Sequence, residues 1–287
     1  MSGHKRRAPL AKAMDNNNMF SVKNSLKFVI RVKILYANHV IAKQKICLSQ
    51  FLRKMTKTNS LIIIRHGQSV WNEKNLFTGW EDADLTNLGR KEAINAANIL
   101  KKSNFVFDLA YTSLLSRAIK TLWITLDELN QAWIPIRKCW EINERHYGHL
   151  TGLNKVKMER EFGSDIVKNW RKSYAYCPLP IEEDSNLWAG LDSRYDNIDP
   201  KLIPTAESLK DTVVRVKKFW IENIVSDLIE GKRIIISAHG NSIRALLMYV
   251  ENITPEAIEE INIPRAIPIH LKFSCDGTFL SRKFLEV

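Results

Sequence analysis

Two short runs of β-branched residues, each ending in His-Gly, constrain the fold of this chain most strongly. Residues 60–64 lead into Arg65-His66-Gly67, and residues 233–237 lead into Ala238-His239-Gly240. Short apolar runs of this kind predict buried strands. Ligands bind beyond the carboxyl ends of parallel strands, so we expect both imidazoles to reach one crevice from two strands.

Helical patterns alternate with the strands along the rest of the chain. We predict a helix over about 87–102 with Thr86 as its N-cap, and a second helix that begins after Ser116 as its N-cap. Two further helices are expected over about 207–229 and over about 241–250. Further strands are expected over 108–111 and 268–273, the latter as the last strand. Residues 173–206 contain four prolines and no clear period, which indicates a loop-rich insertion. This order predicts an α/β fold, a three-layer α/β/α arrangement with a mostly parallel central sheet.

The charge of the chain is concentrated at its N-terminus. Residues 1–57 contain thirteen Lys and Arg and one acid, Asp15, so the formal net charge of +12 arises there. We expect residues 58–287, which are charge-balanced, to form the folded domain and the leader to be disordered. Three interpretations of the leader stay open: a dispensable extension upstream of a natural start at Met55, an organelle-targeting segment, and, least favoured, a nucleic-acid-binding arm.

Composition excludes several classes of protein. Hydrophobic residues make up 45% of the chain and charged residues 26%, which excludes a wholly disordered protein. The apolar runs are far shorter than the roughly 20 residues that a membrane-spanning helix needs. Four scattered cysteines, without Cys-x-x-Cys spacing, favour reduced thiols in an intracellular, cytoplasmic protein: Cys47, Cys139, Cys177 and Cys275.

The residues around the two histidines favour a phosphoryl group as ligand. Arg65 precedes His66, and Arg117 follows the second predicted strand. A neutral imidazole accepts a phosphoryl group well, and the arginines and His239 would neutralise its oxygens without a metal. Gly67 and Gly240 are expected to let the backbone turn sharply and approach an anion. His146 and His149 in HYGH are a weak metal signal, because no third ligand lies nearby, and we expect no metal.

Longer motifs resemble one family. LIIIRHGQSVWNEKNLFTGW, YTSLLSRAIKTLW, INERHYGHLTGLNK, NWRKSY and SAHGNSIRAL resemble the cofactor-dependent phosphoglycerate mutases of the histidine phosphatase superfamily, in unbroken order over about residues 58–285. RHG alone marks the superfamily, whereas NERHYG and FTGW are narrower. The resemblance implies His66 as the phosphorylated nucleophile, His239, Arg65 and Arg117 around the phosphoryl group, and Glu144 as general acid/base. It also implies that substrate contacts come from Asn72, Thr78, Gly79, Arg117, Tyr147, Lys155, Arg171, Lys172, Gly240 and Asn241.

Four departures from the family pattern stand out. Lys172 replaces an arginine, and a lysine holds a carboxylate only as a point charge. Arg265-Ala266 replaces Thr-Gly, and Gln68 replaces a glutamate. The chain also ends before a lysine-containing tail that family members carry. We expect Lys172 and the missing tail to raise the ratio of hydrolysis to transfer above that of the family, because water reaches the phosphohistidine more easily.

The resemblance implies a mutase that interconverts 3-phosphoglycerate and 2-phosphoglycerate, with 2,3-bisphosphoglycerate as phosphoryl primer and no metal. A phosphatase or a bisphosphoglycerate mutase/synthase on the same scaffold is the alternative, and a non-catalytic binding protein is the third hypothesis. Ser69 and Thr78-Gly79 agree with the mutases. The expected partners are small phosphoglycerates and further copies of the chain in a dimer or tetramer, with no membrane and no nucleic acid.

Overall fold

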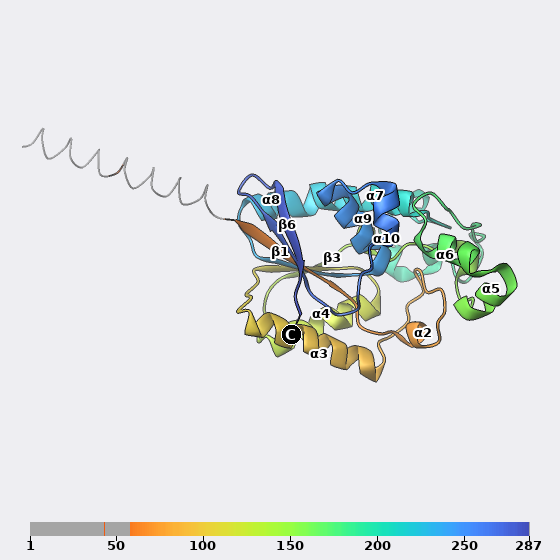
Figure 1. Ribbon diagram of the computed structural model, residues 1–287, viewed down its shortest axis with the longest axis horizontal. Helices are drawn as coiled ribbons and strands as arrows, with labels where there is room; N and C mark the ends of the chain where they lie inside the picture. Colours follow the sequence, from red (N-terminus) through yellow and green to blue (C-terminus); the bar gives the residue numbers. More distant parts are fainter. Residues whose placement is uncertain (1–42, 44–57, 287) are drawn as a thin grey trace, which may run out of the picture. The chain divides into compact units, whose positions relative to one another are not determined.

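A computed structural model describes Lys43 and residues 58–286 (Figure 1). The predicted disorder of the leader, the start at Met55, the targeting segment and the nucleic-acid-binding arm all fall outside the described residues. So does Cys47, whereas Cys139, Cys177 and Cys275 are free thiols. In the part of the chain that the structure describes, no helix has the length and apolarity needed to cross a bilayer.

One six-stranded sheet organises residues 58–286, in the order β3-β2-β4-β1-β5-β6. The first four strands in this order are parallel, and β5 and β6 run antiparallel at one edge. The predicted α/β class with a mostly parallel sheet is confirmed. The strands are β1 (Asn59–Arg65), β2 (Leu109–Thr112), β3 (Ile136–Lys138), β4 (Ile234–Ala238), β5 (Ile269–Phe273) and β6 (Phe279–Phe284).

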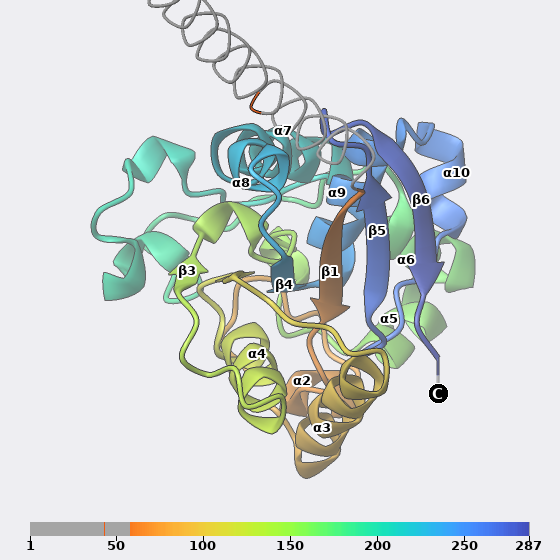
Figure 2. The same cartoon turned by 90° about the vertical axis from the view of Figure 1, so that its left-hand side faces the viewer.

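Helices cover both faces of the sheet, as Figure 2 shows. One layer consists of α3 (Asn87–Lys102) and α4 (Ser116–Glu128). The other consists of α7 (Leu209–Phe219), a π-helical turn (Trp220–Ile224), α8 (Val225–Ile229), α9 (Gly240–Glu251) and α10 (Pro255–Glu260). The predicted helices over about 87–102, 207–229 and 241–250 are therefore confirmed, the second with a π-helical interruption.

Alternation along β1 explains why both layers are needed. Leu61 and Ile63 pack in the core beneath α7 and α9, whereas Ile62 and Ile64 pack beneath α3 and α4. All four side chains are buried. The run Leu61–Ile64 therefore lies at the centre of the sheet, because neither of its faces is open to water.

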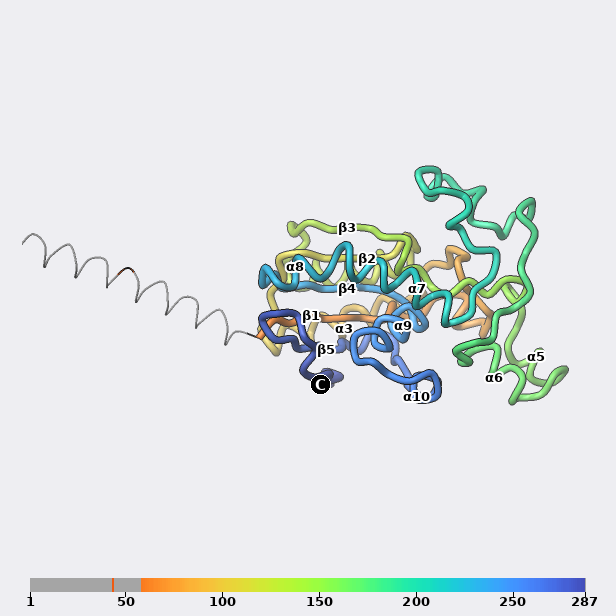
Figure 3. Tube along the Cα trace, turned by 90° about the horizontal axis from the view of Figure 1, so that it is seen from above, coloured from red at the N-terminus to blue at the C-terminus, as the bar shows by residue number. Residues whose placement is uncertain are grey.

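The remaining elements lie beyond the carboxyl ends of the parallel strands (Figure 3). They are three short helices, α2 (Val70–Glu73), α5 (Lys155–Phe162) and α6 (Ser164–Lys172), and five 3₁₀ turns, Trp140–Ile142, Gly148–Leu150, Ala189–Leu191, Ser193–Tyr195 and Pro200–Leu202. The predicted loop-rich segment 173–206 holds only 3₁₀ turns, which confirms that expectation.

The predicted cap of α4 is wrong. Ser116 is the first helical residue, and Leu115 is the N-cap without a side-chain hydrogen bond. The reason is Asp82, which accepts hydrogen bonds from the Ser116 amide and hydroxyl at 2.7 Å each. A carboxylate from a distant loop thus satisfies a donor that a local cap ordinarily satisfies.

Neither Gly67 nor Gly240 has the left-handed backbone that favours glycine. Gly67 instead permits close packing. A Cβ on Gly67 would lie 2.2 Å from the Gly89 carbonyl oxygen, and a Cβ on Gly89 would lie 2.1 Å from the Gln68 carbonyl oxygen. The first turn of α3 therefore touches the backbone that follows β1.

Gly89→Ala is expected to destabilise the protein by about 1–3 kcal/mol, the cost of overpacking a tight contact. Helix propensity alone would make Gly89→Ala stabilising by about 1 kcal/mol. The sign of the change in the free energy of unfolding therefore distinguishes the two effects. Urea unfolding at equilibrium measures the difference. Asn95→Ala, at an exposed position of the same helix, is the control, and a stabilised Gly89→Ala protein would contradict the contact.

Ala266 is a buried residue in the left-handed region, with φ 51°. Its amide donates to the Arg65 carbonyl at 2.9 Å, which holds the segment before β5 against the end of β1. Ala266 stands where the family pattern has glycine, and its Cβ makes this backbone unfavourable by about 1–2 kcal/mol.

Ala266→Gly is therefore expected to stabilise the protein by up to about 1 kcal/mol, because relieved strain exceeds the extra freedom of glycine in the unfolded chain. Thermal and urea unfolding check this. A loss of stability would show that methyl burial outweighs the backbone strain.

Candidate active site

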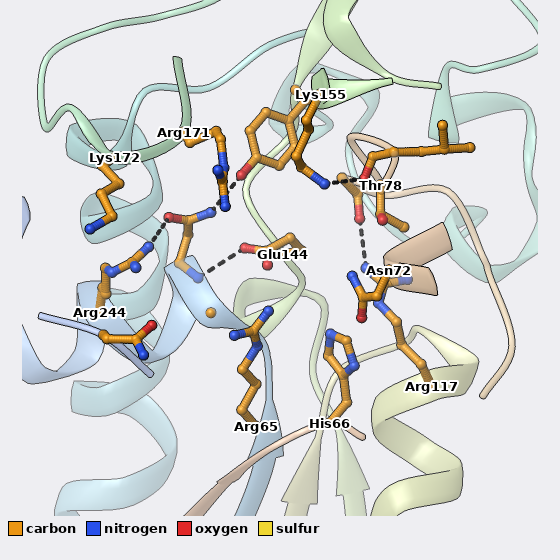
Figure 4. A pocket seen from close by; sticks show the side chains of 16 residues that line it. Arg65, His66, Asn72, Thr78, Arg117, Glu144, Lys155, Arg171, Lys172 and Arg244 are labelled. Atoms are coloured by element: carbon orange, nitrogen blue, oxygen red, sulfur yellow. Dashed lines mark hydrogen bonds between the residues drawn. The ribbon is translucent and has the colours of Figure 1, made fainter. Parts of the chain in front are cut away.

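A polar pocket opens at the carboxyl ends of β1 and β4 (Figure 4). Every predicted site residue lines it except His239. The lining residues are Arg65, His66, Asn72, Leu76, Thr78, Gly79, Arg117, Glu144, Tyr147, Lys155, Arg171, Lys172, Gly240, Asn241, Arg244 and Asn262. The lining comes from the end of β1, from α4, from segments 72–79 and 144–172, which include parts of α2, α5 and α6, and from the first turns of α9.

His66 is held as a neutral imidazole. Its Nδ1 lies 2.7 Å from the Gly67 carbonyl oxygen, and a carbonyl only accepts, so Nδ1 carries the proton. The lone pair of the neutral ring is then on Nε2. Burial, followed by the charges of Arg117 and Arg65, holds the pKa of His66 well below its usual range. The imidazole is therefore unprotonated at Nε2 near neutral pH, as phosphoryl attack requires.

His239 lies against His66 rather than in the lining, with ring centroids 5.0 Å apart. It is fully buried at the start of α9, and its Nε2 lies 2.8 Å from the Ser113 hydroxyl. Its Nδ1 has no partner among the described residues. Burial and the Arg117 charge hold its pKa well below the usual range. The expected convergence of the two imidazoles is observed, with His239 as the inner one.

Two arginines beside His66 form no ion pair with any described carboxylate, although the charge of Glu144 acts on both. Arg117 donates to the carbonyls of Gly79 and Glu81 at 2.8 Å each, and Arg65 donates to the Ile263 carbonyl at 2.7 Å. Burial lowers the pKa of Arg117 to about 10 and also lowers that of Arg65. Buried cations fixed by backbone carbonyls alone form a site that an anion stabilises.

Glu144 enters the same pocket from the side opposite Arg65 and His66, as Figure 4 shows. Its Oε1 accepts from the amides of Asn241 at 3.0 Å and Arg145 at 2.9 Å. Its carbonyl accepts from the indole of Trp80 at 2.6 Å and from Arg215 at 2.9 Å. Side chain and backbone are thus both fixed, which suits a group that exchanges a proton with a bound substrate.

A second group of cations lies at the outer end of the pocket. Lys155 donates to the Leu76 carbonyl, and burial, then the Arg171 charge, lowers its pKa to about 8. Arg171 Nη1 lies 3.8 Å from Glu159 Oε1. The Lys172 side chain has no ion pair or hydrogen bond with any described residue. These side chains leave room for a second anionic group away from His66.

Arg244, Asn262 and Leu76 line the pocket and were not predicted from the sequence. Arg244 donates to Asn241 at 3.0 Å, and Asn241 donates to the Tyr147 hydroxyl at 3.1 Å. The signal was present in HGNSIR, because residues 240 and 244 lie on one face of a helix. Leu76 contributes its carbonyl, which no side-chain pattern reveals.

Two of the departures lie outside the lining. Arg265 pairs with Glu92 at 3.2 Å, and the Gln68 side chain accepts from the Thr86 hydroxyl at 2.9 Å. His146 is buried and its Nδ1 accepts from the Gly148 amide, whereas His149 is exposed. Among the residues that the structure places, no three His, Cys, Asp or Glu side chains gather as metal ligands.

The buried histidines make stability depend on pH. Burial lowers the pKa of His146 to about 4, and those of His66 and His239 also lie well below their usual range. Unfolded imidazoles, with a pKa of about 6.5, bind protons that the folded state excludes. The stabilisation is therefore complete above that pKa and is lost as the pH falls through it.

We expect the free energy of unfolding to fall below about pH 6.5, by up to about 1.4 kcal/mol per pH unit for each buried histidine. Urea titrations between about pH 5 and 8 measure this slope. His149→Ala should leave it unchanged, and a flat profile would contradict burial of the neutral rings.

Comparison with known proteins agrees with this geometry. The family model of the histidine phosphatase superfamily (branch 1) matches residues 61–193 and 179–284. Similar solved structures include a mycobacterial glucosyl-3-phosphoglycerate phosphatase, with 19% identity over 79% of this chain and 97% of that one, at a TM-score of 0.60. An alpha-ribazole phosphatase from Shigella flexneri has 19% identity over 79% of this chain and 96% of that one, at a TM-score of 0.58.

A phosphoglycerate mutase from Bacillus anthracis has 18% identity over 79% of this chain and 93% of that one, at a TM-score of 0.56. At these identities the structures establish the fold alone. The family match spans most of the chain and includes both His-Gly segments. The chain therefore belongs to the histidine phosphatase superfamily, branch 1.

Proposed function

We propose that this protein interconverts 3-phosphoglycerate and 2-phosphoglycerate through a phosphohistidine at His66, primed by 2,3-bisphosphoglycerate and without a metal. The observation that carries the proposal is the distribution of charge in the pocket. Arg65 and Arg117 flank the nucleophile, and the outer cations Lys155, Arg171, Lys172 and Arg244 lie across from it. Among the described residues, Glu144 is the one carboxylate in the lining. Two separated cationic ends fit a small substrate with two anionic groups.

Each proposed step uses groups that line or adjoin the pocket. His66 Nε2 attacks the phosphorus of the primer in line, and the bond from phosphorus to the sugar-acid oxygen breaks. Glu144, entering this step protonated, gives its proton to the departing oxygen. Arg65, Arg117 and His239 surround the phosphoryl oxygens, which carry the charge of the transition state.

The second half runs in reverse on the other hydroxyl. The Glu144 carboxylate takes the proton of that hydroxyl, whose oxygen attacks the phosphorus, and the bond to His66 Nε2 breaks. Transfer to either hydroxyl regenerates a bisphosphorylated intermediate, so isomerisation requires it to turn around without leaving. The outer cations would hold its second anionic group during this exchange.

A phosphatase is the second candidate. Two of the three solved structures named above are phosphatases, and the same Glu144 would activate water instead of a hydroxyl. Lys172 favours this outcome, because a point charge fixes a carboxylate less firmly than the planar fork of an arginine.

A single assay separates the candidates. The purified protein is given 3-phosphoglycerate with and without 2,3-bisphosphoglycerate, and 2-phosphoglycerate and free phosphate are measured together, with a chelator present in parallel. We expect primer-dependent isomerisation that exceeds phosphate release and survives the chelator. Phosphate release that exceeds isomerisation would assign a phosphatase, and neither product would reject the proposed substrate.

A further inference from the structure

The peptide bond between Gly67 and Gln68 joins the nucleophile to a carboxylate outside the pocket. The Gly67 carbonyl accepts from His66 Nδ1 at 2.7 Å. The Gln68 amide of the same peptide donates to Glu92 Oε2 at 2.7 Å. In a trans peptide the carbonyl and the amide point in opposite directions. The imidazole and the carboxylate therefore lie at opposite edges of one peptide group, in a continuous chain of hydrogen bonds.

Glu92 reaches this amide because α3 packs against the backbone that follows β1. Gly89 and Glu92 are three residues apart on α3 and share one face. Without side chains, Gly67 and Gly89 bring the helix within contact distance of residues 67–68. The Glu92 side chain is only 20% exposed, and it does not line the pocket, so it does not contact a ligand there.

Arg265 lies on the far side of the same carboxylate. Its Nε and Nη2 atoms lie 3.2–3.4 Å from the two Glu92 oxygens. The chain thus runs from His66 through the Gly67–Gln68 peptide and Glu92 to Arg265. The positive charge of Arg265 partly offsets the negative charge of Glu92, so the carboxylate polarises the peptide less than it would alone.

We propose that Glu92 is a positioning residue for His66 that acts through the Gly67–Gln68 peptide, and that the positive charge of Arg265 weakens this effect. This inference rests on the proposed role of His66 as the phosphorylated nucleophile. A carboxylate on the amide polarises the peptide and strengthens its carbonyl as an acceptor, because hydrogen bonds in a chain reinforce one another. The Nδ1–H tautomer is thereby favoured, and Nε2 keeps its lone pair toward the pocket.

The same chain also serves the product of attack. When Nε2 bonds to phosphorus and Nδ1 keeps its proton, the ring acquires a positive charge. A carboxylate at the far end of the polarised peptide stabilises that charge. Carboxylates and carbonyls that accept from the second ring nitrogen of a metal-bound histidine act in the same way. Glu92 therefore lowers the energy of both the reactive tautomer and the phosphorylated ring.

The test uses Glu92→Ala and Glu92→Gln in the full chain, with Asn95→Ala on the same helix as control. Imidazole ¹⁵N NMR reports the tautomer of His66, and rapid quench with labelled 2,3-bisphosphoglycerate reports the rate of phosphohistidine formation per folded protein. Glu92→Ala is expected to lower the Nδ1–H fraction and to slow phosphorylation by about tenfold, the lower end of the losses seen when the hydrogen-bond partner of a metal-bound histidine is removed. Glu92→Gln keeps an acceptor without the charge and should fall between Glu92→Ala and the wild type.

Arg265→Gln should act in the opposite direction, raising the Nδ1–H fraction and the phosphorylation rate, because the full carboxylate charge then acts on the peptide. A purely structural role of Glu92 would lower stability without a change in tautomer. Wild-type tautomer and rate in both Glu92 variants would overturn the inference. Absence of a phosphohistidine in the wild-type protein would instead reject the proposed function, and the tautomer measurement would still decide whether Glu92 orients the ring.

Discussion

His66→Ala is expected to abolish the phosphoenzyme and to lower turnover by about 10⁴-fold or more, because the nucleophile itself is removed. The only imidazole beside it in the described chain is His239, whose Nε2 is engaged by Ser113 and whose ring is fully buried. It is therefore poorly placed to replace His66. Turnover of 3-phosphoglycerate and labelling by bisphosphoglycerate measure the loss.

His149→Ala is the matched control for this change. His149 is exposed and does not line the pocket, so its removal should leave both readouts near the wild-type values. A His66→Ala protein that still turns over the substrate would remove phosphoryl transfer through this residue from the mechanism.

Glu144→Gln is expected to lower kcat by about 10²–10⁴-fold, the range for loss of a general acid/base. Glutamine keeps an oxygen that accepts from the Asn241 and Arg145 amides, so the backbone around the site should persist. KM should hold or fall slightly, because a carboxylate beside an anionic substrate repels it. Steady-state kinetics over a range of pH separate the two parameters.

Glu141→Gln provides the comparison for Glu144, since Glu141 lies in the same segment and outside the pocket. It should behave as the wild type. If Glu144→Gln raised KM and left kcat unchanged, Glu144 would position the substrate rather than move protons.

The strongest elements of the fold follow from local pattern. β1 contains the apolar run Leu61–Ile64, β4 is apolar except at Ser237, and α3 and α4 show a buried stripe at helical spacing. The bounds of β1, β4 and α3 and the start of α4 were therefore predicted within one or two residues. β3 and β6 were not predicted, and residues 268–273 are not the last strand. β3 has three residues, and β6 lies at the sheet edge with Ser281, Arg282 and Lys283 at its centre, so only pairing with β2 and β5 defines them.

The site was predictable where function requires particular side chains next to one another in sequence. His66 and His239 could be placed together because each follows a strand of one parallel sheet. The anchoring of Arg117 by the Gly79 and Glu81 carbonyls was not predictable, because it depends on how a loop folds over the helix. The Gly67–Gln68 peptide, bonded on both sides, is hidden for the same reason.

Site-mapped phosphorylation of the wild-type protein tests the central proposal most directly. The protein is labelled with 2,3-bisphosphoglycerate, digested at alkaline pH, where phosphohistidine survives, and sequenced by mass spectrometry, with ³¹P NMR of the intact protein to identify the bonded nitrogen. We expect one phosphoryl group on His66, bonded through Nε2, that 3-phosphoglycerate removes with formation of bisphosphoglycerate. A label on any other residue, or no label under conditions in which the protein isomerises phosphoglycerate, would contradict the proposed mechanism.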